Sequence, residues 1–343
     1  MYVGRFIGNW CYTAEKSPNS SVCITGLSGS GKTCRLNQIE LEEVRLGATV
    51  LVFDLHRSHA EDQVFGEIRE RYLPYVNRIS VLRDGLALPL FTPLRDAYGR
   101  EEPYVHLVNS AVQALGGTFR SASRQIGALR SAVEQVVKSP DGRYNPAEAL
   151  SFFLAAQETQ AADAVYEKLW TVLNCNALRP GTKKIENGKI NILDFSEGDM
   201  LTQSVLAKLT LACIWRYALY SRTMEEKPNI VLALDEFQHL SLKPDSTLCH
   251  LLREGRKFGI SLLLATQTLE AFSKEAKTLL NQTATRLYFR PTLEEIRKIA
   301  KGIDQEKVTE WVKILQRLQV GESLAVGNLC IGGRDVIRPV VLK

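Results

Sequence analysis

A glycine-rich segment near the start of the chain has the residue types that bind phosphate groups. Residues 26–33 read Gly-Leu-Ser-Gly-Ser-Gly-Lys-Thr and fit the pattern G-x-x-x-x-G-K-[ST]. Its glycines let the backbone fold tightly, so that several N–H groups can point at one anion. We expect Lys32 to reach the β- and γ-phosphates of a nucleotide and the Thr33 hydroxyl to ligate Mg²⁺. The predicted nucleotide-binding residues are Gly26, Ser28, Gly29, Ser30, Gly31, Lys32, Thr33 and Cys34.

Two adjacent carboxylates later in the chain supply the second half of a hydrolytic site. Asp235 and Glu236 directly follow the apolar run Ile230–Leu234. Asp235 is expected to hold the magnesium ion, and Glu236 to polarise the attacking water as a general base. The alternative is a helix that simply begins with acidic residues, which the helix dipole favours. Together with the glycine-rich loop, the pair favours a hydrolysing nucleoside triphosphatase (NTPase) over a GTPase switch or a small-molecule kinase.

Strands and helices must alternate to position these residues. Apolar runs without polar alternation are typical of parallel strands that are covered on both faces. One of them, Val22–Thr25, ends directly before the glycine-rich loop, and a helix is expected after it; this context disfavours a glycine-rich turn without a ligand. The runs predict a layered α/β sheet that is mostly parallel. The predicted strands are residues 22–25, 49–53, 78–82, 190–195, 230–234, 261–265 and 286–289.

The middle of the chain has a different pattern. Residues 99–180 are rich in Ala, Leu, Gln, Glu and Arg and contain helical spacing without a convincing strand. We therefore predict an all-helical insertion between a first core part, residues 1–98, and a second, residues 181–343. The second part is expected to end in two helices and a C-terminal β-hairpin that turns at Gly332 and Gly333.

Composition excludes several classes of protein. The 343 residues are 45% hydrophobic and 24% charged with a net charge of +5, which is ordinary for a folded chain and does not by itself argue for a nucleic-acid partner. The 7 cysteines are scattered without a C-x-x-C pair, so a zinc site or disulfide framework is not expected and a reducing, cytoplasmic location is favoured. No apolar run approaches the ~18 residues of a membrane span, so we predict no membrane insertion.

Four stretches of the sequence resemble the HerA/FtsK superfamily of hexameric DNA-pumping ATPases, which includes conjugative coupling proteins and related secretion ATPases. They are the glycine-rich loop, Val-Leu-Val-Phe-Asp ending at Asp54, residues 233–237, and residues 254–267. A weaker fifth stretch covers residues 281–290. The resemblance implies a RecA-like P-loop core, ATP and Mg²⁺ as ligands, and a homohexamer. It spans most of the α/β core but neither the helical insertion nor the tail.

The same resemblance assigns two further roles. Gln267 becomes the polar sensor of the γ-phosphate, and Arg256 becomes an arginine finger that acts on the nucleotide of a neighbouring subunit. Alternatives stay open for both residues: Gln267 can be a strand-end residue without a role, and Arg256 a solvated cation near a helix end. Other candidates for the finger are Arg253, Arg286 and Arg290, and Asp54 has no assigned role beyond a capping one.

The sequence departs from the family before the glycine-rich loop. Many members have a β-barrel or membrane segment there, whereas about 25 residues precede Gly26, so we expect a protein partner to supply that module. Duplex DNA is the expected partner of the motor, gripped through its phosphates by basic loops. The candidates are loops 181–189 and 241–247 with Lys183, Lys184, Lys189 and Lys243, and the insertion residues Arg120, Arg124, Arg130 and Arg143, although such charges are often only solvated.

Three functions compete at this point. The first is an ATP-hydrolysing ring motor that translocates DNA. The second is a secretion or assembly ATPase that remodels or moves protein partners with the same motor core. The third is a nucleotide-dependent interaction module, which the presence of a strong base at Glu236 disfavours.

Overall fold

The computed structural model describes residues 5–7, 10–12, 20–64, 66–86, 88–119, 122–140, 145–179, 183–221, 228–327, 329–331, 334–336 and 338–343. The chain divides into two compact units. The first consists of residues 1–77, 186–192 and 229–343, and the second of residues 78–185 and 193–228.

A large, mostly parallel sheet forms the centre of the first unit, as the sequence predicted. β3 (Val22–Thr25) lies between β8 (Ile260–Thr266) and β9 (Thr285–Tyr288) and runs parallel to both. β7 (Ile230–Leu234) pairs in parallel with β8 on one side and with β4 (Thr49–Asp54) on the other. The strand order is β13-β10-β9-β3-β8-β7-β4-β6-β5, with β5 at Val76–Ser80 and β6 at Ile190–Asp194.

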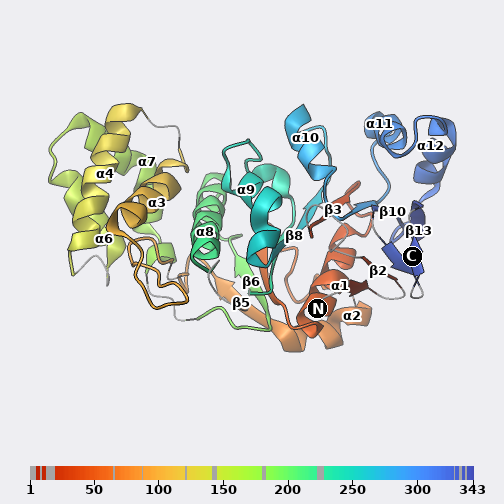
Figure 1. Ribbon diagram of the computed structural model, residues 1–343, viewed down its shortest axis with the longest axis horizontal. Coiled ribbons are helices and arrows are strands. Elements are labelled where there is room, and N and C mark those ends of the chain that lie inside the picture. Colours follow the sequence, from red (N-terminus) through yellow and green to blue (C-terminus); the bar gives the residue numbers. More distant parts are fainter. Residues whose placement is uncertain are drawn as a thin grey trace. The chain divides into compact units, whose positions relative to one another are not determined.

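Helices cover this sheet because its central strands are apolar on both faces. α1 (Lys32–Arg45) contacts β4, β7 and β8, and α9 (Thr247–Glu254) contacts β8. α11 (Leu293–Ile303) and α12 (Val308–Arg317) pack against each other and share an apolar cluster with β9 and β10 (Figure 1). The remaining helices of the unit are α2 (Gly66–Tyr72) and α10 (Lys274–Leu280), with short 3₁₀ turns at Leu73–Tyr75, Phe237–His239 and Gly255–Phe258.

The C-terminal strands divide between two sheets. β10 (Ser323–Gly327) and β13 (Val340–Leu342) form an antiparallel pair at the edge of the main sheet. β11 (Leu329–Ile331) and β12 (Arg334–Val336) form the predicted hairpin and join β1 (Arg5–Ile7) and β2 (Trp10–Tyr12) in a small antiparallel sheet. The expected turn residues Gly332 and Gly333 lie outside the described residues.

The second unit contains the helices that the sequence predicted for the middle of the chain. α3 (Tyr104–Gly116), α4 (Ser123–Lys138), α6 (Pro146–Ala155) and α7 (Gln160–Asn174) pack in a group (Figure 1). The long helix α8 (Met200–Ser221) belongs to this unit as well and contacts α3 and α7. Among the described residues, every helix falls short of the length or apolar character that crossing a membrane requires.

A buried ion pair ties α8 to the segment before α3. Arg216 donates from Nε to both carboxylate oxygens of Glu102 at 3.0 Å. The guanidinium also donates to the carbonyl oxygen of Thr92 at 2.8 Å and to that of Pro89. Both charged side chains are buried, so each depends on the other for its solvation.

We predict that Glu102→Gln lowers the free energy of unfolding by ~3–5 kcal/mol, because it leaves the Arg216 charge buried and unbalanced. The matched control is Glu101→Gln, which removes an exposed ion pair with Arg95 and should change stability by less than ~1 kcal/mol. Urea unfolding of the three proteins measures the difference. Equal unfolding free energies for Glu102→Gln and Glu101→Gln would contradict the stabilising role of the buried ion pair.

Candidate nucleotide-binding site

The glycine-rich loop follows β3 in a conformation that depends on three glycines. Gly26, Gly29 and Gly31 have φ angles of 152°, 72° and 103°. A Cβ on Gly26 would lie 2.6 Å from Cβ of Phe289, and one on Gly31 would lie 3.0 Å from Cα of Gly321. At Gly29 no heavy atom lies within 4 Å of such a Cβ. The loop therefore packs tightly on two sides and leaves open the side on which a phosphate group fits.

Neighbouring segments hold the loop in place through its backbone. The Leu27 N–H donates to the Arg290 carbonyl at 2.9 Å, and the Gly321 N–H donates to the Ser30 carbonyl at 2.9 Å. The Ser30 hydroxyl donates to the carbonyl of Leu27 at 2.7 Å. The turn before β10 and the end of β9 thus brace a loop that lies far away in sequence. Sequence analysis did not identify Gly321 as part of this site.

The beginning of α1 brings Lys32 and Thr33 next to the end of β7. Lys32 is buried, and its Nζ donates to the Leu27 carbonyl at 3.1 Å. The Thr33 hydroxyl donates to Oδ2 of Asp235 at 3.2 Å. Burial lowers the pKa of Lys32, against the opposing influence of Glu236 and Asp235. A hydroxyl and a carboxylate in contact at the start of a helix form the hard oxygen donor set that Mg²⁺ prefers.

Glu236 is held in a strained conformation at the same edge of the sheet. Its φ of 54° lies in the left-handed region, which costs roughly 1–3 kcal/mol for a residue other than glycine. Oε1 accepts from the Gln267 side-chain amide at 2.8 Å, and Oε2 accepts from the amide of Gln238. Gln238 in turn accepts from the Thr266 hydroxyl at 2.6 Å. The structure brings the predicted base and the predicted sensor together and adds Gln238, which sequence analysis missed although it lies two residues after Glu236.

A buried polar network lies behind the acidic pair. The strand register aligns Phe53 with Leu234, so Asp54 and Asp235 follow adjacent strand ends. Oδ1 of Asp54 accepts from the Ser58 N–H at 2.9 Å, and Oδ2 accepts from the His59 N–H at 3.2 Å. Asp54 therefore fixes the turn after β4.

His59 is the buried cation of this network. Its Nε2 donates to Glu40 at 3.1 Å, and the Tyr72 hydroxyl donates to the other oxygen of Glu40 at 2.6 Å. The pKa of His59 rises to about 9, because the charges of Glu40, Asp54 and Asp235 outweigh the opposing effect of burial. Burial raises the pKa of Asp235, and the positive His59 opposes that rise. His59 itself is buried.

Arg256 lies apart from the other predicted site residues. It belongs to the 3₁₀ turn Gly255–Phe258, at the amino end of β8, whereas Gln267 follows the carboxyl end of that strand. Seven residues of extended chain separate the two ends by ~23 Å. Arg256 is thus remote from the loop of its own chain. Among the alternatives, Arg290 contacts the loop through its carbonyl, and Arg286 donates to Asn281 at 3.1 Å.

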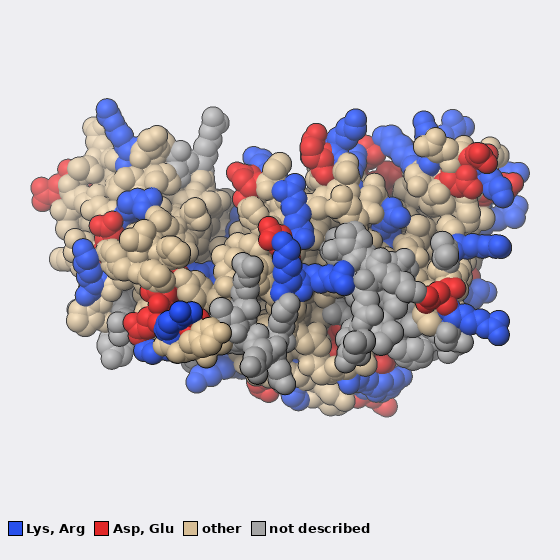
Figure 2. Space-filling view, in the orientation of Figure 1, with Lys and Arg blue, Asp and Glu red and all other residues tan. Residues whose placement is uncertain are grey.

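The candidate DNA-contacting residues that the structure describes differ in their contacts and exposure. Lys183 and Lys189 donate to the carbonyls of Arg78 and Pro74, both at 2.9 Å, and Lys243 is exposed. Arg124 is exposed, and Arg130 donates to Asn109. In Figure 2, acidic side chains (red) lie among the basic ones (blue) on the part of this face that is not grey. Arg120, Arg143 and residues 181–182 lie outside the described residues.

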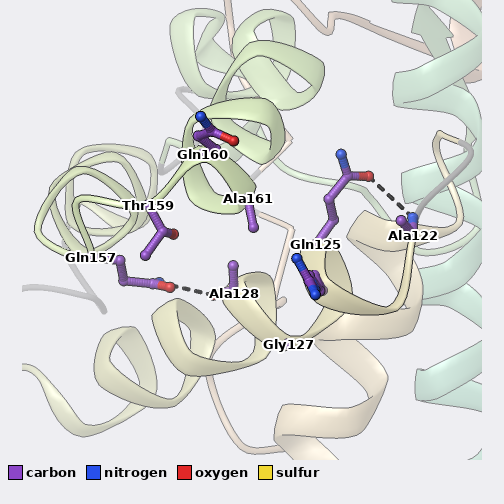
Figure 3. Close-up of a pocket in the computed structure, with 9 residues that line it drawn as sticks. Ala122, Gln125, Gly127, Ala128, Gln157, Thr159, Gln160 and Ala161 are labelled. Atoms are coloured by element: carbon purple, nitrogen blue, oxygen red, sulfur yellow. Dashed lines mark hydrogen bonds between the residues drawn. The ribbon is translucent and has the colours of Figure 1, made fainter.

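A hollow in the second unit lies where α4 and α7 begin (Figure 3). It is lined mainly by glutamine, threonine and alanine side chains. Gln157 donates to the Ala128 carbonyl at 2.9 Å, and Gln125 accepts from the Ala122 N–H at 3.1 Å. None of the predicted nucleotide-binding or catalytic residues lines this hollow.

The raised pKa of His59 gives a prediction for stability against pH. Its ordinary value is 6.5, so the stabilisation from its proton is fully present below that pH and is lost as the pH rises through about 9. The unfolding free energy of the native chain should therefore fall over this interval, and that of His59→Gln should fall less. Urea unfolding at several pH values tests this, with His106→Gln, an exposed histidine, as control. Parallel pH profiles for native chain and His59→Gln would refute it.

Part of the chain matches a known protein family. Residues 182–343 match the family described as the type IV secretion-system coupling protein DNA-binding domain. No curated protein sequence matches the chain.

Several solved structures share the fold. VirB4 of Thermoanaerobacter pseudethanolicus superposes with a TM-score of 0.68 at 18% identity, covering 94% of this chain and 89% of that one. The bacterial conjugative coupling protein TrwBdeltaN70 in its unbound monoclinic form gives 0.66 at 14% identity, with coverage of 100% and 88%. The plasmid coupling protein TrwB in complex with ADP and Mg²⁺ gives 0.64 at 13% identity, with coverage of 96% and 87%. This shared fold confirms the predicted RecA-like α/β core.

Proposed function

We propose that this chain hydrolyses ATP with Mg²⁺ and uses the energy to move DNA. The observation that supports the hydrolytic part is that three features meet at one sheet edge: the glycine-rich loop, the contact of Thr33 with Asp235, and the contact of Glu236 with Gln267. Loop, metal ligands, base and sensor are the parts that phosphoryl transfer to water requires.

Each residue has a chemical role in this proposal. The loop amides and Lys32 hold the phosphates, and Thr33 and Asp235 would hold Mg²⁺, which would supply positive charge to the phosphate oxygens when bound. Glu236 accepts a proton from the attacking water as the water oxygen bonds to the γ-phosphorus and the bond to the β-phosphate oxygen breaks. Gln267 contacts the γ-phosphate. Among solved structures with this fold, TrwB has been seen with an ATP analogue and with ADP and Mg²⁺, which supports the choice of ligands.

Residues 182–343 match a family that is described as a DNA-binding domain of a coupling protein. This match supports DNA as the polymer that the ATPase moves. Lys243 and Arg124 are exposed and available to phosphate groups. A reducing, cytoplasmic location belongs to this proposal, and the cysteines that the structure describes as free thiols fit it: Cys23, Cys34, Cys175, Cys213, Cys249 and Cys330. The alternative, a secretion or assembly ATPase that moves proteins, uses the same hydrolytic site, so only the response to DNA separates the two.

Glu236→Gln should lower kcat at least ~10²-fold while nucleotide binding persists, because the amide cannot accept the proton from water. Lys32→Ala should weaken nucleotide binding instead, through loss of the phosphate contact. Steady-state ATP hydrolysis and binding of a fluorescent ATP analogue measure the two effects. Glu306→Gln, an exposed acid away from the site, is the control. Undiminished turnover in Glu236→Gln would favour the nucleotide-dependent interaction module.

Linear duplex DNA should raise the ATP hydrolysis rate, and added salt should remove the stimulation because counterions compete for the phosphates. The measurement is turnover with and without DNA at several salt concentrations, with Glu236→Gln as the inactive reference. Turnover that depends on Glu236 but is indifferent to DNA would shift the proposal to the protein-moving ATPase.

Arg256 gives a test of action between subunits. Arg256→Ala alone should lose ~10³-fold or more in turnover if the guanidinium acts on a neighbour's γ-phosphate. Mixing Arg256→Ala with Glu236→Gln should restore part of the activity, since some interfaces then combine an intact Arg256 with an intact Glu236. The neighbouring Lys257→Ala, whose amine pairs with Glu254, is the control. Full activity of Arg256→Ala alone would rule out the finger.

A further inference from the structure

Glu295 is a buried carboxylate that the proposed mechanism does not use. It lies in the first turn of α11, where its backbone N–H donates to the hydroxyl of the N-cap residue Thr292 at 3.3 Å. Its side chain is buried, and within the described ranges it has no ion-pair partner. A buried charge of this kind is retained only where hydrogen bonds replace its hydration.

Those hydrogen bonds come mainly from the turn that follows the predicted sensor. Oε1 of Glu295 accepts from the Thr268 hydroxyl at 2.8 Å, from the Leu269 N–H at 2.6 Å and from the Glu270 N–H at 3.3 Å. Oε2 accepts from the Thr292 hydroxyl at 3.1 Å. A helix N-cap alone does not require the first three contacts, which join α11 to the turn at residues 268–270.

That turn is continuous with the residues around the predicted base. The Thr268 N–H donates to the Thr266 hydroxyl at 3.4 Å, and this hydroxyl donates to Gln238, which contacts Glu236. Gln267 lies between Thr266, at the end of β8, and Thr268, so both of its chain neighbours are anchored. Its own side chain is exposed and contacts Glu236. The anchors on either side restrict where the amide of Gln267 can point.

We infer that Glu295 is a positioning residue that fixes the turn at residues 268–270 and thereby aims Gln267 at Glu236 and the γ-phosphate. This inference rests on the proposed hydrolytic function and adds a residue to it. Glu295 touches no reacting atom, and its effect on catalysis passes through Gln267. Because a displacement of about 1 Å in a positioned group can cost ~10²-fold in rate, a lost anchor should be visible in kcat.

The test uses Glu295→Gln with Glu294→Gln as matched control, since Glu294 is the preceding acid of the same helix turn but is exposed. Glu295→Gln should lower kcat ~10-fold or more with KM for ATP unchanged, and Glu294→Gln should alter neither. Hydrogen exchange of the backbone amides at residues 268–270 should speed up in Glu295→Gln only, a readout that is independent of turnover.

A double variant separates positioning from general stability. If Glu295 acts through Gln267, adding Glu295→Gln to Gln267→Ala causes no further loss of kcat. Thr268→Val removes one anchor without removing the carboxylate and should give a smaller loss of the same kind; it replaces Glu295→Gln if that variant fails to fold. The positioning role of Glu295 is overturned if the kcat losses of the two single variants multiply in the double variant, or if Glu295→Gln raises KM. Either outcome leaves the proposed hydrolytic function standing. Full turnover in Gln267→Ala overturns the sensor assignment together with it.

Discussion

Parallel pairing of β3, β8 and β7 is the constraint on which the rest of the site depends. The register aligns Thr25 with Thr266 and Leu234 with Leu264, so the three strands end at nearly the same level. Whatever follows each strand then lies at one edge of the sheet, where open α/β sheets bind ligands. The glycine-rich loop, Gln267 and the acidic pair follow these three ends.

Burial at this edge of the sheet costs free energy, because it removes charged side chains from water. Lys32, Asp54 and Asp235 are all buried, and two of them are carboxylates on adjacent strand ends. The protonated His59, itself held by Glu40, supplies the balancing charge. Hydrogen bonds from Ser58 and from the backbone of the turn after β4 complete the solvation of Asp54. The acidic edge can therefore persist before a metal ion and a nucleotide bind.

The same edge combines rigid support with one strained residue. Glu236 adopts a left-handed conformation that its neighbours impose, and both of its carboxylate oxygens accept from glutamine amides. Strain of this kind persists only where surrounding contacts determine the geometry. Here those contacts come from Gln238, two residues after Glu236, and from Gln267, which follows β8. The geometry of the proposed base thus depends on residues that lie after it in sequence.

The sequence by itself determined the parts of this protein that are contiguous. The glycine-rich loop is one segment of eight residues, the acidic pair follows one apolar strand, and helical spacing marks the middle of the chain. Local chemistry and periodicity were therefore enough to predict the α/β sheet and the helices of the middle region, and to propose nucleotide-binding residues. The tertiary structure alone decided which distant residues support them. Gly321, His59 and Glu295 reach the site through strand register and helix packing, and no spacing in the sequence records those contacts. The division of the C-terminal strands between two sheets has the same origin, because pairing partners such as β2 and β11 lie at opposite ends of the chain.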